Sequence, residues 1–445
     1  MQVNFLPVTC ALTLGLASCH LGLFSKNASE PGSGVPLSAF VATNGQYFPP
    51  FINSFFPAAK SYSREFPSLV QAQDQVTLIE VKPLDAGPSA FNEANLSWSA
   101  DGAYLGYEVV SEGFRKIMLK DLAGNFSREL RVVPKGQSDF LDGMVIKSAQ
   151  SYNAGLRWSR DSTRFAFMSN GGVGDYSIFL GAIGAPEASL GSSHSKDGYA
   201  TWSPSTNELA FVSSRTGNGD IYLAELSTNH FIQLSSGDEV DLFPDWFPSG
   251  DAVVYSSGDA LRHGLFVVSR KDHNAAWTKG TALTNWQHDD LRPTVSPDGR
   301  FVAFYTDATA PGTTLSRRWN IIVVPYEHGR TYHDHELRAM VVAKDVVIDL
   351  NTGPAWSPDS RKIFYVKHAL SVANPIYAYD LFLGRSYLFK TNTRMNRDIL
   401  MSKLGILSFR AQVGVWDRVF VALTNQGLQL QSQTHLPSKI HYLAM

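Results

Sequence analysis

The sequence predicts an all-β protein built from copies of one small antiparallel sheet. Only 18% of the residues are charged, while Gly, Ser, Asn and Tyr are frequent, and this composition suits strands better than helices. Residues 198–225 show the repeated unit, in which three alternating apolar segments are separated by a Pro-containing turn and a Gly/Asn loop. Because one such sheet cannot bury both of its faces, we expect it to pack against copies of itself.

Six copies of the unit share a turn of the type Trp-Ser-Pro-Asp-Gly, followed by an apolar strand. The first residue of this turn defines the Trp position, held by Trp98, Trp158, Trp202, Trp246, Val295 and Trp356. A further repeat of about 45 residues beyond Trp356 reaches Met401. We therefore expect a degenerate seventh copy with strands at 398–401, 406–409, 415–423 and 428–431.

A polar side chain recurs five residues before each Trp position, and we call these seven residues the polar column. It consists of Glu93, Asn153, Asp197, Asp241, Asp290, Asn351 and Asn396. The last member belongs to the copy that was found by spacing alone, so its match supports counting that copy.

The turn, the apolar strand after it and the pattern S-x-R-x-G-N-x-x-I-Y at 213–222 together resemble the β-propeller repeat of TolB and its relatives, which are bacterial periplasmic proteins. The resemblance implies a β-propeller of four-stranded blades over residues 71–445, with seven blades in our count and six as the alternative. TolB carries a separate α/β domain before its propeller, and the segment ahead of these repeats is too short for it. The usual role of TolB is therefore not transferred, since propellers host many unrelated activities.

Two further structural expectations follow from the propeller resemblance. The strand at 76–81 should pair with the last blade and close the ring, which removes an exposed sheet edge. The Trp side chains at the Trp position should pack between neighbouring blades, and the turns after them should reverse the chain.

The N-terminal segment resembles that of a bacterial lipoprotein. An apolar run at 8–17, too short to span a bilayer, ends in Leu-Ala-Ser-Cys, which is similar to a lipobox. The resemblance implies a signal peptide at 1–18 and lipid on Cys19, so the protein would face the periplasm in the bacterial cell envelope. His20 after the lipid site favours the outer membrane. Residues 1–6 lack Lys and Arg, and the alternative is an ordinary cleaved signal or a chance match to the motif.

Residues 19–70 read as a tether, and several insertions lengthen the repeats. The aromatic stretch at 47–57 either packs along the propeller or binds a partner. Long loops are expected at 131–153, 307–318 and 327–345, where function tends to be added. His333 and His335 are weak metal candidates because no third ligand has a suitable spacing, and we expect neither a metal nor a cofactor.

The polar column has two interpretations. Its side chains either lock turns by local hydrogen bonds, or form a partly acidic ring at one mouth of the channel that receives a cation or a basic peptide. The near-neutral balance of 38 basic and 40 acidic residues argues against nucleic acid as a partner.

We expect a monomeric, non-catalytic propeller that binds a protein or peptide partner of the cell envelope at the channel mouth. The sequence has no G-x-S-x-G motif, which argues against a hydrolase of the prolyl oligopeptidase type. The alternative is a carbohydrate-active propeller, either lyase-like or glycan-binding. It would need basic or amide side chains in the channel, for which the candidates are Gln287, His288, Arg292, Arg317 and Arg318.

Overall fold

The computed structural model describes 16 stretches of the chain. They are residues 77–80, 91–111, 114–121, 127–130, 140–141, 144–145, 152–171, 175–191, 195–204, 207–259, 262–285, 287–307, 318–369, 374–389, 391 and 393–423. The predicted signal peptide, Cys19, the tether with its aromatic stretch and the strand at 428–431 lie outside these residues.

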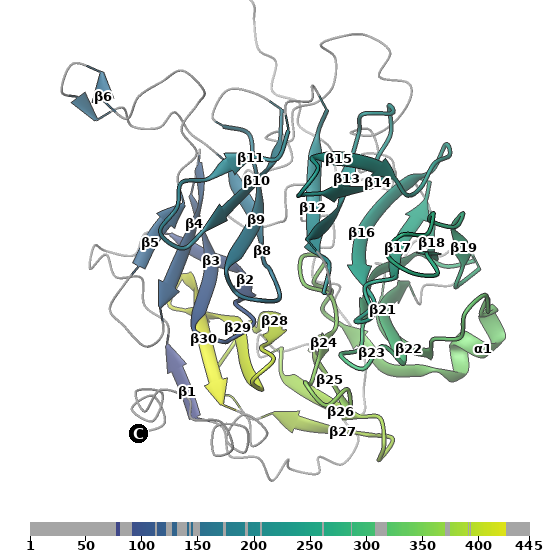
Figure 1. The fold of residues 1–445 in the computed structure, drawn as a ribbon. Helices are drawn as coiled ribbons and strands as arrows, with labels where there is room; N and C mark the ends of the chain where they lie inside the picture. Colours follow the sequence, from purple (N-terminus) through teal and green to yellow (C-terminus); the bar gives the residue numbers. More distant parts are fainter. Residues whose placement is uncertain are drawn as a thin grey trace, which may run out of the picture.

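Seven four-stranded antiparallel sheets form a ring around a central axis (Figure 1). Blade 1 comprises β2 (Asn92–Trp98), β3 (Tyr104–Ser111), β4 (Phe114–Asp121) and β5 (Ser127–Leu130). Blade 2 comprises β8 (Asn153–Trp158), β9 (Arg164–Ser169), β10 (Ser177–Ala182) and β11 (Ala188–Ser189). Blade 3 comprises β12 (Asp197–Trp202), β13 (Glu208–Ser213), β14 (Asp220–Glu225) and β15 (His230–Gln233).

The other blades repeat this order from the axis outward. Blade 4 comprises β16 (Val240–Trp246), β17 (Ala252–Gly258), β18 (His263–Ser269) and β19 (Thr281–Ala282). Blade 5 comprises β20 (Asp290–Val295), β21 (Phe301–Asp307), β22 (Trp319–Pro325) and β23 (Val341–Val346). Blade 6 comprises β24 (Ala355–Trp356), β25 (Lys362–Val366), β26 (Ile376–Asp380) and β27 (Arg385–Phe389). A separate hairpin, β6 (Phe140–Leu141) and β7 (Met144–Val145), lies within the predicted loop at 131–153.

Blade 7 closes the ring with a strand from the other end of the propeller. It comprises β28 (Arg397–Met401), β29 (Ile406–Val413), β30 (Trp416–Leu423) and β1 (Thr77–Glu80). β1 pairs antiparallel with β30, from Thr77 opposite Leu423 to Glu80 opposite Phe420. The seven-blade count and the closure by the strand near 76–81 are thus confirmed, and β1 takes the place predicted for a fourth strand at 428–431.

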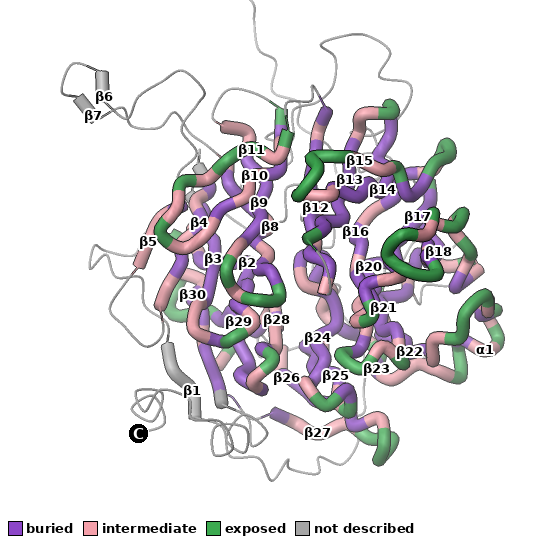
Figure 2. Tube along the Cα trace, viewed as in Figure 1, coloured by how far each residue is buried: buried purple, intermediate pink, exposed green. Residues whose placement is uncertain are grey.

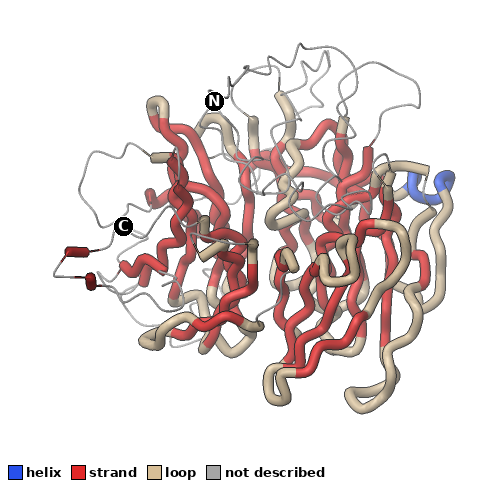
Figure 3. Tube along the Cα trace, turned by 90° about the horizontal axis from the view of Figure 1, so that it is seen from above, coloured by secondary structure: helices blue, strands red, loops and turns tan. Residues whose placement is uncertain are grey.

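The insertion at 327–345 is not an irregular loop as predicted. It contains the short helix α1 (Asp334–Ala339) and most of the outer strand of blade 5. The Glu336 carboxylate accepts a hydrogen bond from the His333 backbone N–H (2.9 Å), which caps the helix, and Leu337 on the helix is buried. Viewed from above, α1 lies at the periphery of the ring, far from the axis (Figure 3).

The Trp side chains join neighbouring blades as predicted. The indole Nε1 of Trp202 donates to the Arg157 carbonyl of the preceding blade (3.0 Å), and the indole of Trp246 donates in the same way to Thr201 O (3.2 Å). Where blade 1 meets blade 7, Trp98 donates instead to Ser408 Oγ (2.9 Å). Buried positions concentrate on the inner and middle strands, and exposed positions in the turns (Figure 2). The core therefore lies between blades.

Each blade carries a left-handed residue three positions before the Trp position. These residues are Asn95, Gly155, Tyr199, Phe243, Arg292, Gly353 and Asp398, with φ between 47° and 76°. In six blades this residue lies within a register shift between the two inner strands. Such a bulge bends the strand and redirects side chains, here beside the axis.

Candidate functional site: the axial pocket

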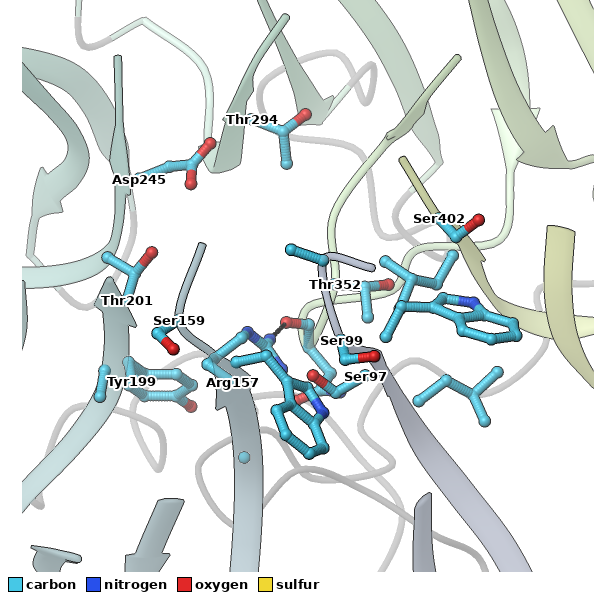
Figure 4. Close-up of a pocket in the computed structure, with 18 of the residues that line it drawn as sticks. Ser97, Ser99, Arg157, Ser159, Tyr199, Thr201, Asp245, Thr294, Thr352 and Ser402 are labelled. Carbon is cyan, nitrogen blue, oxygen red and sulfur yellow. Dashed lines mark hydrogen bonds between the residues drawn. The ribbon is translucent and has the colours of Figure 1, made fainter. Parts of the chain in front are cut away.

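A pocket of about 270 Å³ lies on the axis and takes lining residues from every blade. Each blade contributes at least one hydroxyl or carboxyl side chain to the lining, for example Ser97, Ser159, Thr201, Asp245, Thr294, Thr352 and Ser402 (Figure 4). Several lining residues directly follow the ends of inner strands, such as Ser99 after β2 and Ser402 after β28. The pocket therefore lies at the end of the channel where the inner strands end, next to the Trp positions.

The turns after the inner strands give this end of the channel a fixed shape. In blade 1 the Ser99 hydroxyl donates to Asp101 Oδ1 (2.6 Å) and accepts the Tyr104 backbone N–H (2.9 Å). The same arrangement recurs after β8, β20 and β24. In blade 2 the hydroxyl of Ser159 and the backbone N–H of Thr163 lower the pKa of Asp161 to about 2, so its carboxylate keeps accepting these bonds at neutral pH.

Two arginines from nearly opposite blades extend into the channel. Arg157, on β8, donates to its neighbour Leu156 O (2.7 Å) and to the main-chain oxygen of Asn351. Arg292, on β20, donates to the same Asn351 oxygen (2.5 Å) and is 8% exposed. Burial lowers the pKa of Arg157 to about 10 and also lowers that of Arg292. Arg157 therefore remains a cation at neutral pH.

The charges of the lining are mainly positive. Its described residues include four basic side chains, Arg157, Arg160, Arg292 and Lys403, and one carboxylate, Asp245. Asp245 accepts the Val295 backbone N–H (2.8 Å), and burial raises the pKa of its carboxyl group. Low-dielectric walls concentrate field lines in a cleft, so the pocket favours anionic over cationic groups.

Six members of the predicted polar column lie at the other end of the inner strands, away from the axial pocket, and all seven are buried. None of its seven members is more than 8% exposed. Glu93 binds Arg418 of blade 7 (2.9 Å), and Asp197 accepts a hydrogen bond from Ser195 (3.0 Å). The amides of Asn153 and Asn396 donate to Leu130 O (3.3 Å) and Asn374 O (3.0 Å). These contacts favour the interpretation as turn and blade-to-blade chemistry, and partner binding by the column stays a prediction.

An acidic channel mouth would need fully ionised carboxylates, and the two remaining acids of the polar column, Asp241 and Asp290, are only partly ionised. Burial raises the pKa of Asp241 to about 7 and that of Asp290 to about 7. At neutral pH each is charged only in part. Asn351 is the one member of the column that lines the axial pocket.

Among the other predicted candidates that the structure describes, only Arg292 lines the pocket. The His288 ring contacts the Asp334 carboxylate at the start of α1 (Nε2 to Oδ1, 2.5 Å), and Arg318 forms an ion pair with Asp345 (3.6 Å). Gln287 is not among the lining residues, and Arg317 lies outside the described residues. His333 and His335 are exposed with their rings stacked at 6.5 Å. No group of three or more His, Cys, Asp or Glu in the described part of the chain could hold a metal ion.

Sequence reasoning missed Arg157 and Asp245. Both stand immediately before a Trp position, as do the pocket residues Ser97, Thr201 and Thr294. These residues vary from blade to blade in size and charge, whereas the polar column, four residues earlier, is uniformly polar. A search for the repeat position with the most varied chemistry would have found the pocket.

Comparisons with known proteins agree with the β-propeller fold of this chain. The family model of the TolB β-propeller domain with PD40 repeats matches residues 92–316, just over half of the chain. No curated protein matches the chain. Among the described residues, no helix has both the length and the apolar character needed to cross a membrane.

Three solved structures illustrate the similarity. A puromycin-hydrolysing peptidase from Mycobacterium tuberculosis has 12% identity and a TM-score of 0.52, covering 78% of this chain and 54% of its own. An oligogalacturonate lyase from Vibrio parahaemolyticus has 12% identity and a TM-score of 0.51, covering 79% and 98%. A putative TolB from Agrobacterium tumefaciens has 17% identity and a TM-score of 0.42, covering 72% and 99%. At 12% identity the peptidase and the lyase establish the fold alone. The family model, which matches more than half of the chain, leads to one conclusion: the chain belongs to the TolB β-propeller domain family with PD40 repeats.

Proposed function

We propose that the chain is a non-catalytic binding protein of the bacterial cell envelope, anchored by lipid on Cys19, whose axial pocket receives a protein or peptide partner. The observation that carries the proposal is the pocket itself, because residues from all seven blades converge on it. A concave site with a few convergent polar groups is the usual form of a binding site. The protein acts as a monomer in this proposal.

The lining supports binding more than catalysis. Among its described residues, the ionisable groups are four basic side chains, Asp245 and Tyr199, and none is a histidine. Burial raises the pKa of Tyr199 well above its ordinary value, which makes it a poor general base at neutral pH.

Filling the pocket tests the proposal. Thr201→Trp adds a large ring to the lining, while Thr228→Trp makes the same change on the exposed turn between β14 and β15 of the same blade. In cross-linking pull-downs from intact cells, we expect Thr201→Trp to lose the captured partner and Thr228→Trp to keep it. Equal capture by two folded variants would contradict the proposal.

A carbohydrate-active propeller is the second candidate, and one observation favours it. Arg157 and Arg292 lie in the same pocket as Asp245, and such a grouping of cations with a carboxylate suits an acidic glycan. Release of unsaturated sugar from an acidic polysaccharide by the purified full chain, lost in Arg157→Gln, would favour this candidate over the binding protein.

A further inference from the structure

The inner part of the axial pocket contains an arrangement that specifies the chemistry of its ligand. Resting on the function proposed above, we infer that Arg157 and Arg292 form an anion site that binds a carboxylate of an acidic peptide segment of the partner. Four features of the pocket lead to this assignment: the shared acceptor of the two arginines, their unsatisfied donors, the charge of the lining and the state of its aromatic rings.

The two guanidinium groups share one neutral acceptor. Both donate to the main-chain oxygen of Asn351, although they come from blades 2 and 5. Neither forms an ion pair with a carboxylate of the described chain, whereas other buried arginines do, such as Arg270 with Glu208 (2.7 Å). Buried cations are normally paired, but Asp245 and Asp349 act on these two arginines only from beyond ion-pair distance, so no described carboxylate contacts the guanidinium groups directly.

Donors around this carbonyl are also unsatisfied. Arg292 Nε is buried without a hydrogen-bond partner, and so is Nδ2 of Asn351, a residue only 4% exposed. Both residues line the pocket. Buried donors in native proteins almost always have partners. A carboxylate only accepts hydrogen bonds, has about four lone-pair sites and fits the planar fork of a guanidinium, so it matches this set of donors.

The rim of the pocket adds to the positive charge. Arg160 and Lys403 are exposed and line the pocket, so an approaching acidic segment would meet them before Arg157 and Arg292. Asp245 is the only carboxylate among the lining residues that the structure describes. Electrostatic steering of this kind raises the association rate and weakens with added salt.

The aromatic lining favours a peptide over a sugar. Trp158 already stacks on Tyr104 (5.6 Å between ring centroids) and contacts the edge of Phe165 (5.3 Å). Trp98 and Trp158 are each 8% exposed. Neither ring offers a free face for a pyranose ring, whereas a carboxylate side chain or a chain end needs only the hydrogen-bond donors of the lining.

Two matched peptides test the site on the full chain. Fluorescein-labelled hexaglutamate and hexaglutamine are titrated at low ionic strength, and binding is followed by fluorescence anisotropy. We expect hexaglutamate to bind at least about tenfold more tightly, and Arg157→Gln/Arg292→Gln to lose this preference. Arg157→Lys/Arg292→Lys should recover only part of it, because lysine keeps the charge but not the fork. Arg338→Gln, on the exposed face of α1, is the control and should bind like the parent.

A rim variant keeps the test decisive if the double glutamine variant does not fold. Arg160→Gln/Lys403→Gln leaves Arg157 and Arg292 in place, and we expect slower association of hexaglutamate with a weaker salt dependence. Equal affinity for the two peptides would overturn the inference. So would unchanged rates and salt dependence in a folded rim variant.

Further outcomes separate this inference from the proposed function. If the native partner is lost in Thr201→Trp but hexaglutamate and hexaglutamine bind alike, the anion site is wrong and the proposed function stands. If hexaglutamate binds through the two arginines but Thr201→Trp still captures the partner, the anion site stands and the proposed function fails. Displacement of hexaglutamate by a trigalacturonate at a much lower concentration would overturn the peptide assignment in favour of an acidic glycan.

Discussion

Asp290 and Arg292 lie two residues apart on β20 and show how strongly position governs chemistry in this ring. Asp290, at the start of the strand, is 0% exposed, and burial raises its pKa to about 7. Arg292 follows in the left-handed conformation, which a branched or long side chain adopts only with strain, and lines the axial pocket. The bulge thus separates a buried structural residue from one available to a ligand.

The raised pKa values of Asp241 and Asp290 predict a pH-dependent stability. An acid whose pKa is higher in the folded state binds more protons there, so its contribution is complete below its ordinary pKa near 3.8 and is lost as the pH rises to about 7. Each acid should reduce the free energy of unfolding by roughly 2–4 kcal/mol between pH 4 and pH 8. Asp241→Asn/Asp290→Asn should flatten this decline in urea unfolding, whereas the exposed Asp272→Asn should not.

The same double variant separates the two interpretations of the polar column. If the column only locks turns and blades, partner capture should be unchanged at low salt. Weaker capture by a folded Asp241→Asn/Asp290→Asn protein would instead support an acidic site for a basic partner and count against the positively charged pocket. An unaltered pH profile would show that the two carboxyl groups are not buried as described.

At the scale of elements, ring closure depends on both strands and side chains. β1 supplies the outer strand of blade 7, and Glu93 of β2 binds Arg418 Nη1 (2.9 Å) and the Val419 backbone N–H (2.9 Å) on β30. The Glu93 side chain is 1% exposed and that of Arg418 is 10% exposed. This buried ion pair joins the first and last blades.

Glu93→Gln is expected to weaken the closure. Removing one partner of a buried ion pair leaves the other charge uncompensated and costs about 3–5 kcal/mol. Glu129→Gln removes the partner of Lys116 in the same blade, where both side chains are partly exposed, and should cost under about 1 kcal/mol. Denaturant unfolding of the two variants provides the measurement, and similar losses in both would mean that Glu93 does not hold the ring closed.

Some elements of the fold could be predicted from the sequence, and others could not. The turns and Trp contacts recur within each repeat, and local pattern therefore located the blades. The bulges could not be foreseen, because Tyr199, Phe243 and Arg292 occupy a conformation that local propensity assigns to glycine. Packing between blades overrides that propensity. The helix α1 was missed for a related reason, since its six residues are stabilised by a cap and by the burial of Leu337.

The candidate site was only partly predictable. The sequence located a channel lined by inner strands, but the polar column is occupied by contacts such as Glu93 with Arg418, which are 325 residues apart. Contacts over that separation are not visible in a repeat pattern. Arg292 was among the predicted channel residues, whereas Arg157 and Asp245 emerged only when the blades were assembled around the axis.

At the scale of the whole molecule, the proposal combines a membrane anchor with an axial binding pocket. Cys19→Ser removes the sulfur that would carry the lipid, so the protein should move from the membrane fraction to the soluble fraction on cell fractionation. Lipid attachment through a sulfur requires that atom, and serine differs in little else. A variant that remains with membranes at an unchanged level would contradict the lipoprotein assignment.

The central claim is that a partner enters the axial pocket from the end formed by the Trp-position turns. The most direct measurement is site-specific photocross-linking in intact cells, with the photoreactive residue placed at Thr201 in the pocket or at Thr228 on the outer turn of the same blade. The account predicts a discrete cross-linked product from position 201 that is absent from position 228 and is lost when Arg157 and Arg292 are both replaced by Gln. A product from position 228 with none from position 201, in folded proteins, would contradict it.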